Sequence, residues 1–348
     1  MPSMTPPAPP SGGSTGPRLA GGRLAILESL RELERAGSPG VLAIVLQTSG
    51  STYRKPGALV LLDAAGVRAG ALSGGCLEAE LERLAREVID AGRAREVRFD
   101  TTGDEDRVFG SGTGCGGSSR VLLMPLPAAA SPVRDALFVA DAHGLALEFA
   151  LTDPASGEGE AHVGNEVFRF DRSGAPRTAD ATPGTPLRVV VPAPRRLLLF
   201  GAGPETRPLL ALLRLLDWQV ELLEHRARWL RYAEPGGADR VHEQPPEHAS
   251  TLLATKRFDA ALAMYHNMAL DARALRQLAA AAIEHVGLLG PPARRDDLLR
   301  EIGSEASMQL DGRLQAPVGL PLGGEGAEAI ALSIAAQLQQ RFASRSGA

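Results

Sequence analysis

A continuous apolar run that leads straight into a glycine turn is the feature that most constrains how this chain can fold. Residues 195–206 read RRLLLFGAGPET, and the helical pattern RPLLALLRLLDW follows at once. An apolar run without polar alternation is typical of a strand that is covered on both faces. A buried strand that passes through Gly201 and Gly203 into a helix predicts the opening unit of a parallel α/β sheet.

The sequence after this unit keeps alternating between strand and helix patterns. The strand runs are QVELLE, FDAALAMYHN and HVGLLG, and the helical runs are ALDARALRQLAAAAIE, RRDDLLREIG and GEGAEAIALSIAAQLQQRFA. Such alternation implies right-handed crossovers and a parallel sheet. We therefore predict a Rossmann-like, doubly wound parallel sheet over residues 195–343.

The glycine turn matches only part of the dinucleotide-binding pattern. Glu224 follows the second strand, where an acid can accept ribose hydroxyls. The third position of the pattern is Thr206 rather than glycine or alanine, and Pro204 has no N–H to offer a pyrophosphate. Glu205 adds a negative charge that suits the helix dipole but opposes a phosphate. These departures favour a scaffold, or a site for a different ligand, over a working nicotinamide dehydrogenase.

A polar segment follows another predicted strand of the same sheet. The stretch MYHNMALD places His266, Asn267 and Asp271 just beyond the strand's carboxyl end. Doubly wound sheets bind their ligands at that edge. A single histidine in this position is as often structural as functional, so both interpretations stay open for His266.

The first part of the chain is predicted to form a separate α/β domain with a mixed sheet. Residues 24–37 and 77–92 have helical apolar spacing, and short apolar runs at 41–48, 57–63 and 67–73 have the character of strands. The expected organisation is a disordered tail at 1–18, a cysteine–glycine loop domain at 19–127, a connecting segment with short strands at 128–194, and the Rossmann-like domain at 195–343.

The two cysteines of the chain lie in similar glycine-rich surroundings. Cys76 stands in SGGCLE and Cys115 in GSGTGCGG. Glycine is favoured where a backbone must approach a ligand closely, and a thiol at a helix N-terminus, as expected for Cys76, has a lowered pKa. A thiolate there would serve as a metal ligand or a nucleophile. The alternative is that each cysteine is a small buried hydrophobic residue.

A third polar loop, QTSGSTYRKPG at 47–57, ends the first predicted strand. Ser51 offers a hydroxyl group, and Arg54 can bind a phosphate through two parallel hydrogen bonds. The alternative is an ordinary hairpin loop. Three glycine-rich loops within one small domain favour a ligand site.

Composition excludes several classes of function. The net charge is −4 and the cations are scattered, so the chain lacks the basic stripe that nucleic acid requires. No apolar run reaches the roughly 18 to 20 residues of a membrane span, and the first residues have no apolar core like that of a signal peptide. We expect a cytoplasmic protein with reduced thiols and no structural zinc site.

These segments, taken in order, resemble the XdhC/CoxI family. The matching stretches are TSGSTYRKPGA, GALSGGCLEAE, FDTTGDEDRVFGSGTGCGG, LLLFGAGPE, MYHNMALD, VGLLGPPARRDDLL and APVGLPLGGEGAEAIALSIAAQL. The ordered set spans roughly residues 20 to 343 and is far more specific than any one motif. The family has a similar architecture, with a cysteine-bearing N-terminal domain and a C-terminal Rossmann domain.

The resemblance implies a molybdenum-cofactor chaperone rather than an enzyme. Such a protein binds the cofactor, protects it while a cysteine desulfurase or other sulfurtransferase supplies the terminal sulfido ligand, and delivers it to a xanthine dehydrogenase-type molybdenum hydroxylase. It also implies a homodimer and a cofactor in the molybdopterin form or with an added nucleotide. The family's cysteine positions carry over onto Cys76 and Cys115, as molybdenum contacts.

The predicted cofactor-binding residues fall into two groups. They are Cys76, Cys115, Gly74, Gly75, Gly112, Gly114, Gly116, Gly117, Ser51 and Arg54 in the N-terminal domain, and Gly201, Gly203, Glu224 and His266 in the C-terminal domain. The chain departs from the family at the first Rossmann turn, where Pro204 replaces the usual histidine. Two alternatives remain: an NAD(P)-dependent oxidoreductase, and a non-catalytic interaction module.

Overall fold

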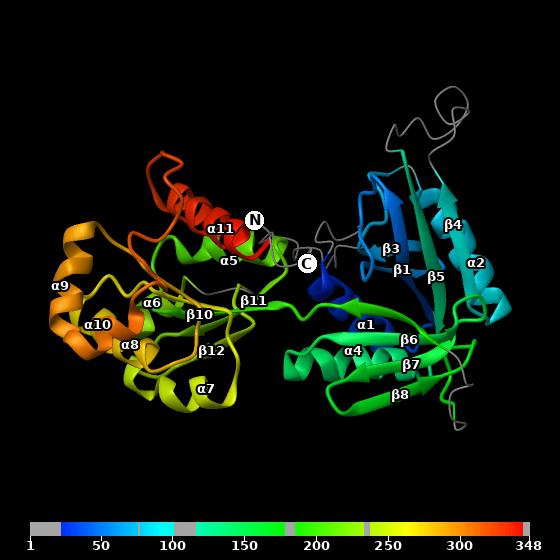
Figure 1. Ribbon diagram of the computed structural model, residues 1–348, viewed down its shortest axis with the longest axis horizontal. Coiled ribbons are helices and arrows are strands. Elements are labelled where there is room, and N and C mark those ends of the chain that lie inside the picture. The colour runs from blue at the N-terminus through cyan, green and yellow to red at the C-terminus, as the bar shows by residue number, and fades with distance from the viewer. Residues whose placement is uncertain (1–21, 76, 101–115, 178–184, 233–236, 344–348) are drawn as a thin grey trace, which may run out of the picture.

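The computed structural model describes residues 22–75, 77–100, 116–177, 185–232 and 237–343. In that part of the chain, three sheets form two halves (Figure 1). The expected tail at 1–18 lies outside the described residues, as do Cys76, Cys115, Gly112 and Gly114. The α/β class and the C-terminal Rossmann sheet are confirmed.

The first sheet has the strand order β3-β2-β1-β5-β4. Its strands are β1 (Gly40–Gly50), β2 (Leu59–Asp63), β3 (Gly66–Ala69), β4 (Arg95–Asp100) and β5 (Gly117–Leu126). Every described pairing in this sheet is antiparallel, so the mixed sheet expected from the sequence is wrong in this detail. The turn between β2 and β3 is short enough to join only antiparallel strands, and β1 pairs antiparallel with both β2 and β5.

Helices α1 (Arg23–Ala36) and α2 (Glu78–Ala91) cover opposite faces of this sheet. Alternate residues of β1 point to the two sides: Leu42 and Ile44 pack with α1, and Val41 and Ala43 pack with α2. This follows from the two-residue period of a strand. Gly37 ends α1 in the left-handed conformation, at φ 58°, as the glycine in the sequence predicts.

The connecting segment contains more order than its composition indicated. It forms α4 (Pro132–His143) and a second sheet of β6 (Leu147–Asp153), β7 (Glu158–Val163), β8 (Glu166–Phe170) and β9 (Leu187–Val191), in the order β8-β7-β6-β9. Helix α4 was not predicted, although Ser131 accepts a hydrogen bond from the N–H of Arg134 at its start and Gly144 ends it. Its apolar side chains share one core with α1 and the first sheet.

The second half is a parallel sheet with the order β12-β11-β10-β13-β14-β15. Its strands are β10 (Arg195–Phe200), β11 (Trp218–Leu223), β12 (Arg240–His242), β13 (Ala260–Ala263), β14 (His285–Leu288) and β15 (Leu314–Gln315). Its helices are α5 (Thr206–Leu215), α6 (Ala227–Leu230), η1 (Pro246–His248), α7 (Ala249–Thr255), α8 (Met268–Ala279), α9 (Pro292–Ile302), α10 (Ser304–Leu310) and α11 (Ala327–Ala343).

Separate apolar cores lie on the two faces of this sheet, which makes it doubly wound. Helices α5 and α11 pack on one face, and α7 to α10 pack on the other (Figure 1). Among the described residues, no helix is both long and apolar enough to cross a membrane.

Polar contacts join the two halves. An ion pair connects Arg214 of α5 with Glu28 of α1. The side chain of Gln219 donates to Asp141 of α4 at 2.5 Å, and the guanidinium of Arg196 donates to the Asp141 carbonyl at 3.1 Å. The Rossmann sheet is therefore anchored to both helices, α1 and α4, of the first half.

Candidate functional site

The antiparallel register brings the ends of all three glycine-rich segments to one edge of the first sheet. Ser118, at the start of β5, pairs with both Ser49 and Asp100, near the ends of β1 and β4. The start of β2 and the end of β3 meet at the same edge, since Leu61 pairs with Ala69. The segments that leave this loop edge are 51–58, 70–77 and 101–116.

Two of these segments touch at their glycines. A Cβ on Gly117 would lie 2.2 Å from the carbonyl oxygen of Ser51, and a Cβ on Gly50 would lie 2.5 Å from that of Gly116. The hydroxyl oxygens of Ser49 and Ser118 are 2.9 Å apart. Only glycine permits such an approach of backbones, so the loop that carries Ser51 is held against the residues that follow Cys115 in the sequence.

Glu78 organises the segment on either side of position 76. Its carboxylate accepts hydrogen bonds from the N–H groups of Leu72 at 3.1 Å and Ser73 at 2.8 Å, and from the Ser73 hydroxyl. The Ser73 oxygen in turn accepts from the N–H groups of Gly75 and Leu77. Burial acts to raise the pKa of Glu78, but these hydrogen bonds outweigh it and lower the pKa. The first helical residue of α2 thus fixes the preceding turn.

Three of the glycines that flank the two cysteines in the sequence have no close neighbours among the described residues. A Cβ built on Gly74, Gly75 or Gly116 would meet no described atom within 4 Å. Gly75 and Gly116 have φ values of 116° and 57°, which disfavour other residues for conformational reasons. Among the described residues, none is packed against these three backbones at the loop edge.

Arg54 lies in the same loop as Ser51, but it also faces the second half of the molecule. Burial raises the pKa of the Asp217 carboxyl group, which lies in the turn between α5 and β11. The positive charge of Arg54 opposes this rise. The loop is tied to the second sheet as well, since a Cβ on Gly57 would lie 2.1 Å from the carbonyl oxygen of Val190 in β9. This loop thus connects the loop edge with the contact between the halves.

The strand order of the Rossmann sheet reverses between β10 and β13, the position at which doubly wound sheets have their ligand crevice. Gly201 has φ 88°, and a Cβ there would lie 2.6 Å from the Cα of Tyr265. A Cβ on Gly203 would lie 2.7 Å from Nε2 of His266. Gly201 is therefore required for the close approach of the two backbones, whereas a side chain at position 203 would meet the side-chain ends of Glu205 and His266.

Glu224 is buried and has protein partners for both of its oxygens. Oε2 accepts from the N–H of Ala202 at 3.0 Å and from Arg226 at 2.7 Å. Oε1 accepts from the backbone N–H of Arg226 at 2.8 Å and from its Nε at 2.9 Å. Burial acts to raise the pKa of Glu224, but the bonds from Arg226 outweigh it and lower the pKa. Its observed partners thus differ from the ribose hydroxyls expected from the sequence.

The three polar residues after β13 have different surroundings. Asn267 caps α8 by accepting from the N–H of Leu270, and Asp271 is buried and accepts from the N–H of Tyr265. The side chain of His266 is 41% exposed, and its Nε2 lies 2.7 Å from Oε1 of buried Glu205. His266 and Asn267 are both exposed, but the side-chain oxygen of Asn267 is engaged in the helix cap, whereas Asp271 is buried.

Family models match a segment in each half of the chain. A model described as "XdhC Rossmann domain" matches residues 197–338, and a model described as "XdhC and CoxI family" matches residues 33–100. The chain belongs to the XdhC/CoxI family. The family resemblance predicted from the motifs is thereby confirmed.

Similar proteins cover nearly the whole of this XdhC/CoxI chain. A Bacillus subtilis (strain 168) protein, named as a probable subunit of xanthine dehydrogenase, is 28% identical over 311 residues, which span 86% of this chain and 92% of that protein. A crystal structure described as a xanthine dehydrogenase from Bacillus halodurans is 26% identical, with a TM-score of 0.74, and covers 92% of this chain and 96% of that one.

The family matches include most of the predicted site positions of this XdhC/CoxI protein. Cys76 lies within the first matched range, whereas Cys115 follows its end at residue 100. Gly201, Glu224 and His266 lie within the Rossmann match. Within the described residues, no three His, Cys, Asp or Glu side chains are placed to hold a metal. The assignments of cofactor-binding residues stay predictions.

Sequence reasoning missed two parts of the site. Glu78 gave only a general signal, because acidic residues are favoured in the first turn of a helix but that preference does not specify which groups they bind. The pairing of Glu205 with His266 gave none, since the two are 61 residues apart in sequence. Their contact depends on the parallel neighbours β10 and β13.

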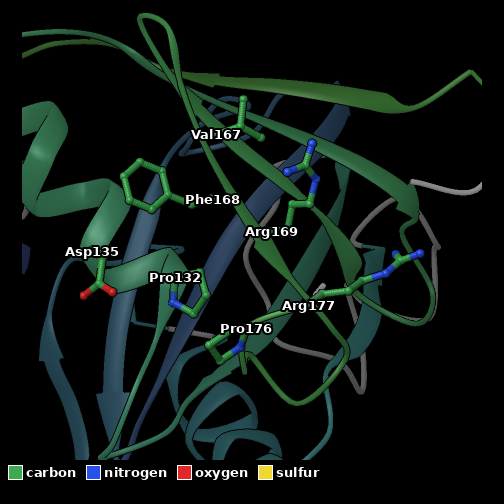
Figure 2. Close-up of a pocket in the computed structure, with 7 residues that line it drawn as sticks. All are labelled: Pro132, Asp135, Val167, Phe168, Arg169, Pro176 and Arg177. Atoms are coloured by element: carbon green, nitrogen blue, oxygen red, sulfur yellow. The ribbon is translucent and has the colours of Figure 1, made fainter. Parts of the chain in front are cut away.

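A shallow hollow of about 260 Å³ lies between α4 and β8 and contains none of the predicted site residues (Figure 2). Its lining comprises Pro132, Asp135, Val167, Phe168, Arg169, Pro176 and Arg177. Both arginines are in ion pairs, Arg169 with Glu160 and Arg177 with Glu158. With these charges already compensated, we assign no ligand to this XdhC/CoxI surface.

Proposed function

We propose that this chain is a molybdenum-cofactor chaperone that serves the maturation of a xanthine dehydrogenase-type molybdenum hydroxylase. Membership of the XdhC/CoxI family and the relatives named for xanthine dehydrogenase support the link to that class of enzyme. The cofactor, in the molybdopterin form or with an added nucleotide, is the ligand of the loop edge.

One observation carries this proposal: the register of the antiparallel sheet gathers the ends of the three glycine-rich segments at one edge. No described residue packs against Gly74, Gly75 or Gly116, which is compatible with a ligand that approaches these backbones. A molybdenum–dithiolene centre supplies a soft metal, for which thiolates are suitable ligands, and a phosphate, for which glycine-rich backbone N–H groups are suitable donors.

The chain's own groups have distinct parts in this proposal. Cys76 and Cys115 offer sulfur to the metal, and the N–H groups of the glycine segments offer hydrogen bonds. Glu78 keeps the turn before α2 in one conformation, which reduces the ordering entropy that a ligand must overcome. Ser51 and Arg54 extend the polar surface toward the contact between the halves.

Binding of purified cofactor tests the proposal directly. We expect Cys115→Ala and Cys76→Ala each to weaken binding at least about tenfold, since each removes a soft contact. The matched control is Thr113→Ala, which alters the same loop without touching a sulfur. Equal affinity of wild type and both cysteine variants would remove the cysteines from the site, and no binding by wild type would overturn the chaperone assignment.

Reconstitution tests the delivery step and the partners. Incubation of a cofactor-free molybdenum hydroxylase with the loaded chain and a cysteine desulfurase should yield more active, sulfido-containing enzyme than incubation with free cofactor. The same cysteine variants should lose this advantage. A homodimer, the expected oligomeric state, is measured by sedimentation at micromolar concentration. An activation yield independent of the chain would contradict the delivery role.

A further inference from the structure

Glu205 and His266 face each other across the point where the strand order of the Rossmann sheet reverses. Glu205 follows β10 and His266 follows β13, and these two strands are neighbours. In doubly wound sheets, ligands bind in the crevice outside this point. The 2.7 Å contact between Nε2 of His266 and Oε1 of Glu205 therefore lies where the strand order of such a sheet predicts a ligand site.

The backbone donors of the glycine turn are already engaged within the protein. The N–H of Gly201 donates to the Leu223 carbonyl at 3.0 Å, and that of Gly203 donates to the Thr206 hydroxyl at 2.8 Å. The N–H of Ala202 donates to Glu224, as described above. A dinucleotide pyrophosphate normally binds to this turn, and here it would meet a buried carboxylate in place of free donors.

His266 offers the crevice a different polar group. Glu205 occupies Nε2, whereas Nδ1 has no hydrogen-bond partner within the described residues. The backbone of His266 is left-handed, at φ 53°, which is uncommon for a residue other than glycine. A carboxylate behind one imidazole nitrogen fixes the ring and favours its protonated form, as in catalytic and ligand-binding histidines.

Charged groups from each neighbouring element act on this imidazole. Glu205 lies at the start of α5, Asp271 belongs to α8, and Arg294 belongs to α9. The hydrogen bond that His266 donates to the Glu205 carboxylate is the largest influence and raises the pKa of His266, while burial and Arg294 oppose it. Asp271 and Arg294 compensate each other in an ion pair with 2.5 Å between Oδ2 and the guanidinium.

We propose that the Rossmann crevice is a second binding site, in which Nδ1–H of the His266 imidazolium donates to an anionic oxygen of a small ligand. Glu205 is a positioning residue, because it acts through His266. The ligand bears a compact oxyanion, either tetrahedral or a carboxylate, rather than a dinucleotide pyrophosphate. This site lies on the other sheet from the loop edge, so the inference does not rest on the proposed function.

The proposal predicts a definite pH dependence. An anion that binds only the imidazolium loses affinity as the pH rises above the pKa of His266, by about tenfold for each further pH unit. A ligand that donated a hydrogen bond to neutral Nδ1 would show the opposite dependence. The sign of the slope therefore distinguishes an oxyanion from a hydroxyl-bearing ligand.

Chemical-shift titration of the full chain measures this dependence at constant ionic strength. Sulfate represents a tetrahedral oxyanion and acetate a carboxylate, and neither titrates between pH 6 and 9. We expect one of them to shift the His266 ring signals saturably, at millimolar concentration or below, with affinity that falls as the pH rises. ADP-ribose, which carries a diphosphate, is expected to bind at least tenfold more weakly than the preferred oxyanion, because the N–H groups of the glycine turn are already engaged.

Two variants and one control complete the test. His266→Asn suits a left-handed backbone and should abolish the pH dependence, whereas His143→Asn, at an exposed position of α4, should preserve it. Glu205→Gln should lower the pKa of His266 and shift the pH at which affinity falls by the same amount. Unsaturable shifts, equal shifts at all exposed histidines, or affinity that rises with pH would each overturn the proposal.

Discussion

The carboxylate of Asp217 accepts a hydrogen bond from the backbone N–H of Arg23 at 2.9 Å, across 194 positions of sequence. It also accepts from the N–H of Leu24 at 2.8 Å, so a residue of the Rossmann half caps the first helix of the other half. The Arg23 guanidinium donates to the carbonyls of Leu145 and Pro192. Arg23 thus links Leu145, just before β6, and Pro192, just after β9, to the turn that precedes β11 of the Rossmann sheet.

Asp217→Gly should weaken this link without straining the chain, because Asp217 itself has φ 64° and glycine accepts that conformation. We expect a loss of about 1 to 2 kcal/mol of unfolding free energy, typical of a lost helix cap. Urea denaturation measures it, with exposed Asp90→Asn as the control. An unchanged midpoint would mean that solvent replaces the cap at no cost.

Glu78→Ala should loosen the turn that precedes α2. The substitution removes the acceptor for the N–H groups of Leu72 and Ser73, and we expect a cost of about 1 to 2 kcal/mol. Amide hydrogen exchange should accelerate at those two positions, and affinity for the molybdenum cofactor should fall. The matched control, Glu80→Ala, also alters the first turn of α2 but removes only an exposed ion pair with Arg83. Similar exchange rates in both variants would contradict the role given to Glu78.

Gly117→Ala and Gly116→Ala form a matched pair at the loop edge. A methyl group on Gly117 would lie 2.2 Å from the Ser51 carbonyl oxygen, whereas one on Gly116 would meet nothing described within 4 Å. We expect about 1 to 3 kcal/mol of destabilisation from overpacking at Gly117. Gly116→Ala should lower the free energy of unfolding by about 1 kcal/mol through backbone strain alone, because position 116 has φ 57°. Thermal denaturation compares the two, and the reverse order would contradict the close approach of the two segments.

His285 should make the protein sensitive to acid. Burial in β14, assisted by the charge of Arg341, lowers the pKa of His285 from 6.5 to about 4. Between these values the unfolded chain binds a proton that the folded chain does not, so stability falls as the pH drops from 6.5 toward 4. The full difference corresponds to roughly 3 kcal/mol.

His285→Phe tests this origin of the acid sensitivity. The variant keeps an aromatic ring against Phe342, which His285 contacts edge to face at 6.2 Å between centroids. Urea midpoints between pH 4 and 7 should vary less in this variant than in the wild type, whereas His248→Gln, at an exposed position, should leave the slope unchanged. A slope equal to that of the wild type would assign the acid sensitivity to other groups.

Local patterns were sufficient for the architecture of the second half. The apolar run at 195–200 and the glycine turn after it are properties of consecutive residues, and they predicted β10, the turn and α5. Helix α4 was missed because its apolar residues are not strongly segregated to one face, and its stability comes from a core shared with α1 and both sheets of the first half.

The sequence by itself determined the α/β class, the Rossmann sheet and the family, because strand and helix periodicity and an ordered set of motifs are encoded along the chain. Tertiary structure decided which distant groups meet. It joined Glu205 to His266 and Asp217 to Arg23, and it brought the ends of the glycine-rich segments to one edge. Those outcomes depend on strand order and register, which arise from the packing of whole sheets rather than from any local preference.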